Sequence, residues 1–428
     1  MNSEERRKAR YERRKAAREK KKRERLAQYD NFDKMTDANV IVEAFEKSKK
    51  GVSWKSSAQR YEMNLLQNTN DSIKKLKAGE QIAQGFIEFD LRERGKVRHI
   101  KSVHIKERCI QRALCDYSLV PMLSNSLIYD NGASLEGKGI DFALDRLDKH
   151  LHWFYRHNGF SNEGYILTID FTGYFDNIRH DHCYEILEEK FTDQRIIALA
   201  KQLIETFDDG EQKGLGIGSQ ISQILAITYP DKIDHFIKEK LGIKCYGRYM
   251  DDSYLIHKDK EYLKYCLEEL RKQYAELGII VNEKKTQIIK LSHGFTFLKM
   301  RHYLTDTGKV VKKPGKDSIV RERRKLKKLK RKFDDGEILF SEIQAQYRSW
   351  RGHIKRANAA YHTIENMDRL YNSLFVLSRG GLDNGEYTFQ RFQKDLPGRV
   401  RKIMRQQNID YIPRFESSHG KYRGDRID

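Results

Sequence analysis

Two β-forming runs that lead into aspartates constrain the fold of this chain more than any other feature of its sequence. The run Tyr165–Ile169 is nearly all β-forming and ends at Asp170. Further along, alternating residues over 244–257 predict a hairpin with Asp251 and Asp252 at its tip. A carboxylate at the end of a buried strand is costly unless a cation pairs with it, and two adjacent carboxylates repel each other. Divalent cations bound between the two runs would relieve both problems.

The three aspartates have the ligand chemistry of a magnesium site. Hard oxygen ligands suit Mg²⁺, which usually keeps waters and substrate phosphates in its shell, and Mn²⁺ is an alternative. Two such ions about 4 Å apart can activate a primer 3′ oxygen and stabilise a leaving pyrophosphate. An Asp-Asp pair alone is most often just a turn. Its position between two β-runs, after a strand that also ends in aspartate, makes Asp170, Asp251 and Asp252 the predicted catalytic metal ligands.

The remaining pattern predicts a mixture of helices and short strands, which is an α+β chain. A glycine-rich loop is predicted at 210–219, with a helix after it to about Leu241. Helical spacing of apolar residues covers 27–85, 105–119, 139–155, 180–207, 260–277 and the chain from 333 to about 405. Further strands are predicted at 86–89, 97–100, 279–281, 286–290 and 295–300.

The charge of the chain indicates a polyanionic partner. Its 428 residues include 83 Lys and Arg against 62 Asp and Glu, a net charge of +21. This excess favours nucleic acid over a membrane surface, although ribosomal and chromatin proteins are equally basic. No apolar run approaches the length of a membrane span. The N-terminus opens with charged residues and lacks an apolar signal region, so we do not expect secretion. Five scattered cysteines without a Cys-x-x-Cys pair are typical of reduced thiols in a cytoplasmic protein.

Two stretches concentrate the positive charge. Residues 1–26 carry 13 Lys or Arg and 5 Glu, with almost no apolar side chains. They are either a solvated tail or an arm that holds phosphates. Residues 312–332 carry 12 Lys or Arg against 2 acids.

The motifs around the aspartates resemble those of reverse transcriptases, and within them the bacterial group that includes group II intron, diversity-generating retroelement and related defence-associated enzymes. Asp170-Phe171-Thr172-Gly173-Tyr174-Phe175-Asp176-Asn177-Ile178 resembles the first catalytic motif, and Tyr249-Met250-Asp251-Asp252 the second. The resemblance extends from about residue 35 to about residue 375. It implies a right-hand polymerase with fingers, an antiparallel-sheet palm and a helical thumb. It also implies that Asp170 and Asp251 ligate both metals, assisted by the Phe171 carbonyl, with Asp252 in support.

Further positions follow from the same resemblance. The residues expected at the incoming nucleotide are Lys96, Arg98, Phe175, Ile217, Gly218, Ser222, Gln223, Tyr249 and Lys285. Phe175 stands where the family has its steric gate against ribose, or it is an ordinary core residue. Lys96 and Arg98 would hold the triphosphate, or belong to a solvated hairpin. Ser222 could equally be a helix cap, Ile217 could simply pack on the palm, and Lys285 could be a solvated neighbour.

Primer and template contacts are expected at a second set of residues. They are Phe297, Leu298, Lys299, Arg323, Arg324, Lys327, Lys328, Trp350 and His353. The chain departs from the family at Glu107, Ile217, Gln223 and Lys299, where Asp, Gln, Pro and Gly are common. The form Ile-Gly-x-x-x-Ser-Gln at 217–223 is the version seen in diversity-generating and defence-associated enzymes.

The expected organisation has five parts: a basic arm at 1–30, fingers with the first part of the palm at 31–160, the palm at 161–305, the thumb at 306–375, and an extension of unknown role at 376–428. The expected activity is RNA-directed DNA synthesis in the cytoplasm of a bacterial host, in a retroelement or an antiphage defence system. The expected partners are an RNA template, nascent cDNA and dNTPs, with a noncoding RNA or a small accessory protein as candidates and no membrane. The alternative is a maturase-like RNA-binding protein without polymerase activity.

Overall fold

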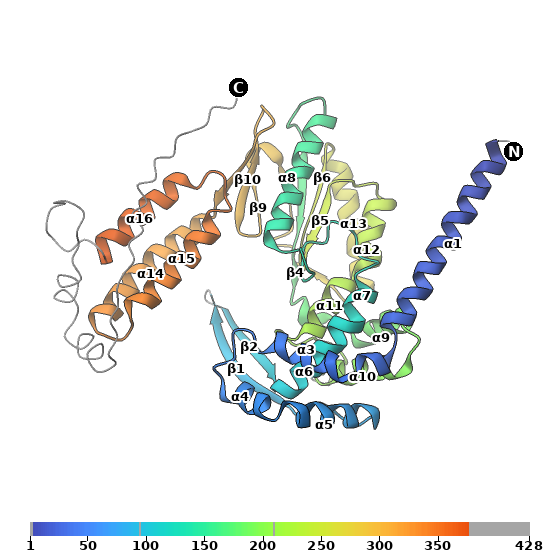
Figure 1. Cartoon of the computed structure of the whole chain (residues 1–428). Helices are drawn as coiled ribbons and strands as arrows, with labels where there is room; N and C mark the ends of the chain where they lie inside the picture. The colour runs from blue at the N-terminus through green and yellow to red at the C-terminus, as the bar shows by residue number, and fades with distance from the viewer. Residues whose placement is uncertain (1–2, 94–95, 209, 376–428) are drawn as a thin grey trace. The chain divides into compact units, whose positions relative to one another are not determined.

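The computed structural model describes residues 3–93, 96–208 and 210–375, and Figure 1 labels their elements. The chain divides into two compact units. The first comprises residues 1–298 and 303–310, and the second comprises residues 299–302 and the chain from 311 onward. Among the described residues, no helix combines the length and apolarity needed to cross a membrane.

Five helices open the first unit. They are α1 (Ser3–Tyr29), α2 (Phe32–Met35), α3 (Ala38–Ser48), α4 (Ser56–Met63) and α5 (Leu65–Lys77). Helix α1 is exposed along most of its length, as its charged sequence requires. The short polar side chains of Asn31 and Asp37 begin α2 and α3 by accepting hydrogen bonds from backbone amides two or three residues ahead.

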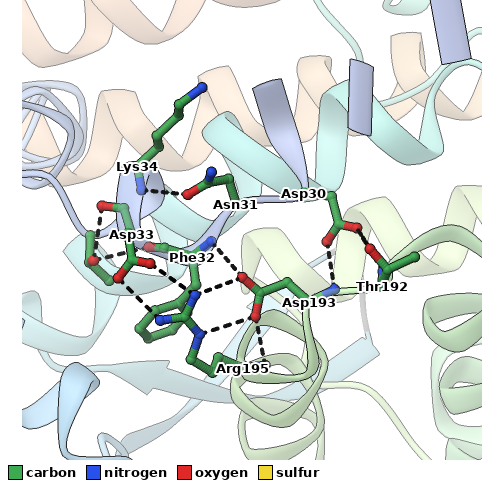
Figure 2. Close-up of polar contacts among 9 residues, drawn as sticks. Asp30, Asn31, Phe32, Asp33, Lys34, Thr192, Asp193 and Arg195 are labelled. Atoms are coloured by element: carbon green, nitrogen blue, oxygen red, sulfur yellow. Dashed lines mark hydrogen bonds and ion pairs between the residues drawn. The ribbon is translucent and has the colours of Figure 1, made fainter. Parts of the chain in front are cut away.

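The segment that follows α1 is hydrogen-bonded to residues 192–195, which are far away in the sequence, as Figure 2 shows. Asp30 accepts hydrogen bonds from the Thr192 amide at 2.7 Å and the Asp193 amide at 3.1 Å. In return, the Phe32 amide donates to Asp193 at 3.0 Å. Arg195 donates two hydrogen bonds to the carboxylate of Asp33, at 3.0 and 3.1 Å. We call this set of contacts the arm clasp.

A hairpin and three helical segments complete the N-terminal part. Strands β1 (Phe86–Glu93) and β2 (Lys96–Val103) pair antiparallel, from Phe86 opposite Val103 to Glu93 opposite Lys96. The predicted helix over 105–119 is present as α6 (Ile105–Leu114) followed by a π-helical segment, Cys115–Leu119, and then by α7 (Val120–Leu123). Helix α3 packs on α6, which buries residues such as Ile41 and Ile110 in the main core.

A four-stranded sheet in the order β5-β6-β3-β8 supports the three predicted acids. Its strands are β3 (Tyr165–Ile169), β5 (Tyr246–Tyr249), β6 (Asp252–His257) and β8 (Gln287–Lys290). β3 is central and antiparallel to β6 on one side and to β8 on the other. Alternation along β6 directs Tyr254 toward α8 (Ile140–His157) and Leu255 into the core that contains α13 (Lys260–Glu276).

The remaining elements of the first unit frame this sheet. A second, two-stranded sheet pairs β4 (Phe171–Thr172) with β7 (Ile280–Val281). The helices are α9 (His180–Lys190), α10 (Gln194–Glu205), α11 (Gln220–Thr228) and α12 (Asp231–Glu239). The prediction of a single helix over 180–207 is therefore wrong, because two helices cover this range. The range is interrupted at residues 191–193, where Asp193 caps α10 by accepting from the Arg195 amide.

A three-stranded sheet has the order β11-β10-β9. Its strands are β9 (Phe295–Phe297), β10 (Met300–Leu304) and β11 (Val310–Pro314). The strand predicted over 295–300 is wrong in one respect, because Leu298 and Lys299 form a turn inside it with φ values of 46° and 67°. Two positive φ angles in a two-residue connection are the signature of a type I′ hairpin turn.

Three helices form the body of the second unit (Figure 1). They are α14 (Lys316–Asp334), α15 (Phe340–Ile354) and α16 (Tyr361–Phe375). Tyr347 of α15 stacks on Tyr371 of α16 with ring centroids 4.3 Å apart. Leu326 and Met367 are fully buried between the helices. The part of the predicted helical region beyond residue 375, and the predicted extension 376–428, lie outside the described residues.

Candidate active site

The central sheet brings the predicted acidic residues to neighbouring strand ends. Ile169, the last residue of β3, lies opposite Ser253 of β6, so Asp170 follows directly beside the start of β6. Asp252 is the first residue of β6 and lies opposite Tyr249, the last residue of β5. Asp170, Asp251 and Asp252 are therefore presented at the same edge of the sheet, and all three are partly buried.

The tip of the β5–β6 hairpin has a constrained backbone. Met250, between Tyr249 and Asp251, has a φ of 55°, a value that residues other than glycine rarely adopt. A strained residue of this kind persists only when its surroundings hold it, and such residues gather at functional sites.

A buried ion pair that the sequence did not predict supports this hairpin. Arg248 and Asp234 are both fully buried, and the Nε of Arg248 lies 3.0 Å from each carboxylate oxygen of Asp234. The same guanidinium donates to the carbonyl oxygens of Ile227 at 2.7 Å and Met250 at 3.3 Å. The signal in the sequence was an arginine within an otherwise buried β-run, which requires a buried partner.

Lys285 lies at the acidic edge. Its Nζ donates to Oδ1 of Asp170 at 2.7 Å. This hydrogen bond raises the pKa of Lys285, and the charges of Asp170, Asp252 and Asp251 add to the effect. The loop that carries Lys285 is held by a backbone bond from the Asn282 amide to the Asp170 carbonyl at 2.8 Å. This edge of the sheet therefore concentrates negative charge, and the ammonium group of Lys285 is bound to Asp170.

The carboxylates of the three aspartates are suitable ligands for divalent metal ions, but they are not grouped closely enough here to hold one. No three His, Cys, Asp or Glu side chains in the described part of the chain form a group that could hold a metal ion. Three carboxylates with one lysine nevertheless leave an excess of negative charge, and carboxylate oxygens are the ligands that Mg²⁺ prefers. For Asp170 to ligate a metal, Lys285 would have to release the Oδ1 atom that it now binds.

Phe175 and the glycine-rich loop lie next to each other. The ring of Phe175 is partly buried and meets Tyr174 edge to face at 5.9 Å, and its carbonyl accepts from the Leu215 amide at 2.9 Å. A cavity of about 380 Å³ adjoins this contact and is lined by residues of β2, of the loop, and by Asp176 and Phe207. Ile217 lines it and is 38% exposed. Phe175 is thus neither fully exposed nor a fully buried core residue.

The other predicted nucleotide contacts fall in different settings. Gly218 has a φ of 103° with open space around its Cα, so its backbone conformation, and not a close approach, explains the glycine. Ser222 is fully buried inside α11, whose N-cap position is Ser219, so the interpretation of Ser222 as the cap is wrong. Gln223 is exposed, and Tyr249 is partly buried. The side chains of Lys96 and Arg98, on β2, lie outside the described residues.

The predicted primer and template residues are spread over both units. Phe297 is buried and packs edge to face on Tyr254 at 5.0 Å. Trp350 is only 9% exposed and its indole N–H donates to the Ser318 hydroxyl at 3.3 Å, a setting that gives it a packing role. His353 is partly buried on α15. The four cations predicted on α14 are all exposed: Arg323, Arg324, Lys327 and Lys328.

A palm-like sheet with acids at one edge, helices behind it and a glycine-rich loop beside it defines a right-hand polymerase fold of α+β class. Residues 77–302 match the family model of reverse transcriptase (RNA-dependent DNA polymerase). The match covers more than half of the chain, and the protein belongs to the reverse transcriptase family. Members of this family use divalent metal ions.

Two solved structures are similar to the chain. One is apo telomerase from Candida tropicalis truncated from its C-terminal domain, at 15% identity and a TM-score of 0.42, over 53% of this chain and 54% of that one. The other is telomerase from Candida albicans in complex with the TWJ fragment of telomeric RNA, at 13% identity and a TM-score of 0.46, over 78% of this chain and 62% of that one. The chain thus spans little more than half the length of these relatives. No protein with a curated description matches.

Proposed function

We propose that this protein is an RNA-directed DNA polymerase that adds deoxynucleotides to a primer 3′ end as directed by an RNA template. One observation carries the proposal: Asp170 and the Asp251–Asp252 turn lie at adjacent strand ends, beside Lys285. Family membership supports the same reaction. Asp170, Asp251 and Asp252 are the proposed ligands, and two bound Mg²⁺ or Mn²⁺ ions would supply activation of the primer hydroxyl and stabilisation of phosphate charge.

The other residues of the site would position the reactants. Lys285, once exchanged from Asp170, would offer its ammonium group to the triphosphate, where a cation offsets developing negative charge. Phe175 would stand beneath the sugar, and Ile217 would face the nascent base pair from the cavity wall. The buried pair of Arg248 and Asp234 would hold the Asp251–Asp252 turn in place without touching substrate.

The proposal is tested by replacing ligands with near-isosteric amides. Asp170→Asn and Asp251→Asn each remove a charge while nearly preserving shape. We expect extension of a DNA primer on an RNA template with Mg²⁺ to fall by about two orders of magnitude or more, while RNA affinity largely survives. Asp306→Asn, an exposed aspartate in the β10–β11 turn, is the matched control. Unchanged extension in both site variants would overturn the assignment of Asp170 and Asp251 as ligands. Wild-type protein that binds RNA without extending a primer would favour the maturase-like alternative.

The biological setting is a separate proposal. We propose a bacterial or phage retroelement or antiphage defence enzyme that acts in the cytoplasm, with a noncoding RNA or a small accessory protein as an additional partner. The form Ile217-Gly218 followed by Ser222-Gln223 supports this subgroup. Paired variable and template repeats beside the gene would indicate diversity generation, and a defence island would indicate antiphage function. A gene with neither neighbour would argue against the proposal.

A further inference from the structure

A second and larger cavity lies in the first unit, and none of its lining residues belongs to the proposed active site. Its volume is about 950 Å³, within the range of small-ligand sites. One wall is the exposed face of α8, and the other is the chain just before β5. The lining residues are Asp130, Arg146, Lys149, His150, His152, Trp153, Tyr155, Arg156, His157, Lys244 and Cys245.

The charge of this cavity is strongly positive. Four lysine or arginine side chains line it against one acid, Asp130. That acid is itself neutralised, because Arg146 lies 2.5 Å and Lys238 2.7 Å from its two oxygens. Burial would raise the pKa of Asp130, but the interactions with His150 and Lys238 outweigh burial and hold the pKa well below its usual value. Asp130 therefore cannot also neutralise Lys244 or Arg156.

The floor of the cavity is a fixed network. The buried His150 of α8 shares a hydrogen bond of 2.9 Å with the hydroxyl of Tyr254 on β6. Its other ring nitrogen lies 3.3 Å from Arg146, which is bound to Asp130. This network is preorganised, which lowers the entropic cost of holding a ligand.

A stack of two aromatic rings completes the cavity wall. Trp153 and His157, one turn apart on α8, stack with ring centroids 3.9 Å apart and an angle of 17°. The carbonyl of Trp153 bonds Nδ1 of His157 at 2.8 Å and fixes the second ring. Lys244 lies over the Trp153 ring at 5.6 Å from its centroid. Exposed rings bordered by cations are the arrangement with which proteins stack unpaired bases and hold the adjoining phosphates.

We propose that this cavity binds an unpaired nucleotide of a single-stranded nucleic acid, at a place separate from the template–primer site. The base stacks on the outer face of the exposed His157 ring, which Trp153 supports from behind, and the flanking phosphates contact Arg156 and Lys244. A strand held here would be tethered to the polymerase whether or not it is being copied. The inference does not depend on the polymerase reaction, because it rests on this cavity alone.

The test uses the full chain with its template–primer site saturated. Protein saturated with an unlabelled RNA–DNA template–primer is titrated with fluorescent single-stranded RNA, and separately DNA, of about 12 nucleotides. We expect Trp153→Ala with His157→Ala, which removes both stacked rings, to weaken strand binding on the order of tenfold. Arg156→Glu with Lys244→Glu should weaken it further and reduce the slope of log affinity against log salt by about 1.4, roughly 0.7 for each lost phosphate contact. Melting temperature checks that each variant is folded.

The chain offers close controls. Trp54 is 72% exposed in the same unit and carries Lys55 over its ring, also at 5.6 Å, so Trp54→Ala removes an equivalent ring outside the cavity. Lys50→Glu with Lys258→Glu reverses two exposed charges elsewhere. Equal affinity in cavity and control variants would overturn the proposal. So would competition by a free dNTP or AMP as effective as that of the strand, or thiouridine crosslinks that map outside α8 and residues 241–245.

Discussion

Charged and polar side chains buried in this protein differ in how they are compensated. The Arg248–Asp234 pair satisfies both charges at once, so removal of one partner is expected to cost about 3–5 kcal/mol. His302 on β10 is also fully buried, but its burial lowers its pKa to about 3 and keeps the ring neutral. The arginine is stabilised as an ion, whereas the histidine is stable only without its proton.

We expect His302 to make the fold sensitive to acid. Its folded-state pKa is lowered from 6.5 to about 3, so its contribution to stability is present above pH 6.5 and is lost as the pH falls toward 3. Near pH 4.5 the loss should be about 2–3 kcal/mol. His302→Phe should flatten the dependence of the urea midpoint on pH. His362→Phe, at a largely exposed histidine, should leave the dependence intact. Parallel pH profiles for the wild type and His302→Phe would contradict this expectation.

Ile217 should set part of the fidelity of the proposed polymerase. Many reverse transcriptases have Gln here, but Ile offers neither donor nor acceptor, and it faces the cavity beside Phe175 at 38% exposure. One hydrogen bond contributes about 1 kcal/mol, which is roughly a fivefold change in a rate ratio. Ile217→Gln should therefore lower misincorporation several-fold, counted by sequencing cDNA from one template, with Ile217→Leu as the apolar control. An equal or higher error rate in an active Gln variant would remove the inference.

At the scale of elements, strands and helices with strong local patterns could be predicted from the sequence. The hairpin around residues 93–96, the helices beginning at Ile105, Ile140 and Lys260, and the strand ending before Asp170 all lie where periodicity placed them. Elements that depend on distant contacts could not be predicted. The break at residues 191–193 is held by Asp30, far away in sequence, and no local pattern encodes it. β11 was missed because its lysines look like part of the basic stretch that follows.

The same distinction holds at the site. The three aspartates could be predicted because each stands at the end of a β-run, and Lys285 because its motif is local. The support from Asp234 to Arg248 could not, since it joins an amphipathic helix to a strand through side chains alone. The turn at Leu298 and Lys299 carries no glycine or asparagine, which are the residues that usually mark a type I′ turn.

This turn gives a prediction about stability. Lys299 has a φ of 67°, where glycine is free of strain and other residues are not. Lys299→Gly should raise the free energy of unfolding by about 1 kcal/mol, observed as a higher urea midpoint. Lys313→Gly, in the extended strand β11, should instead destabilise and serves as the control. A lower midpoint for Lys299→Gly would show that the lysine side chain contributes more than its backbone strain costs.

At the scale of the whole molecule, the basic arm is both exposed and firmly rooted. Helix α1 has 27 residues, so it is roughly 40 Å long at 1.5 Å per residue. The charged side chains of α1 make few packing contacts. The arm clasp nevertheless joins the segment after its C-terminal end to the start of α10. A rooted helix of this kind is better suited to holding phosphates than a loose tail would be.

We expect removal of residues 1–25 to weaken RNA binding and reduce its salt dependence, because each lost phosphate contact removes roughly 0.7 from the slope for single strands. The truncation keeps Leu26 and the arm clasp, so the melting temperature should barely change. A full-length variant with Arg6, Arg7, Lys8 and Arg10 changed to Gln preserves the helix and should show part of the effect. If the salt slope is the same with and without the arm, α1 does not contact RNA.

The central position of β3 has a consequence for how the molecule opens. Its amides are bonded to β6 on one side and to β8 on the other, and Leu167 and Ile169 are buried. Protons on such amides exchange with solvent only through the largest opening events, whereas those of the two-stranded β1–β2 hairpin exchange through small ones. In deuterated water, the segment leading into Asp170 should be among the last to gain mass. The hairpin should gain mass early. Local opening of this enzyme would then leave the strand that positions Asp170 intact.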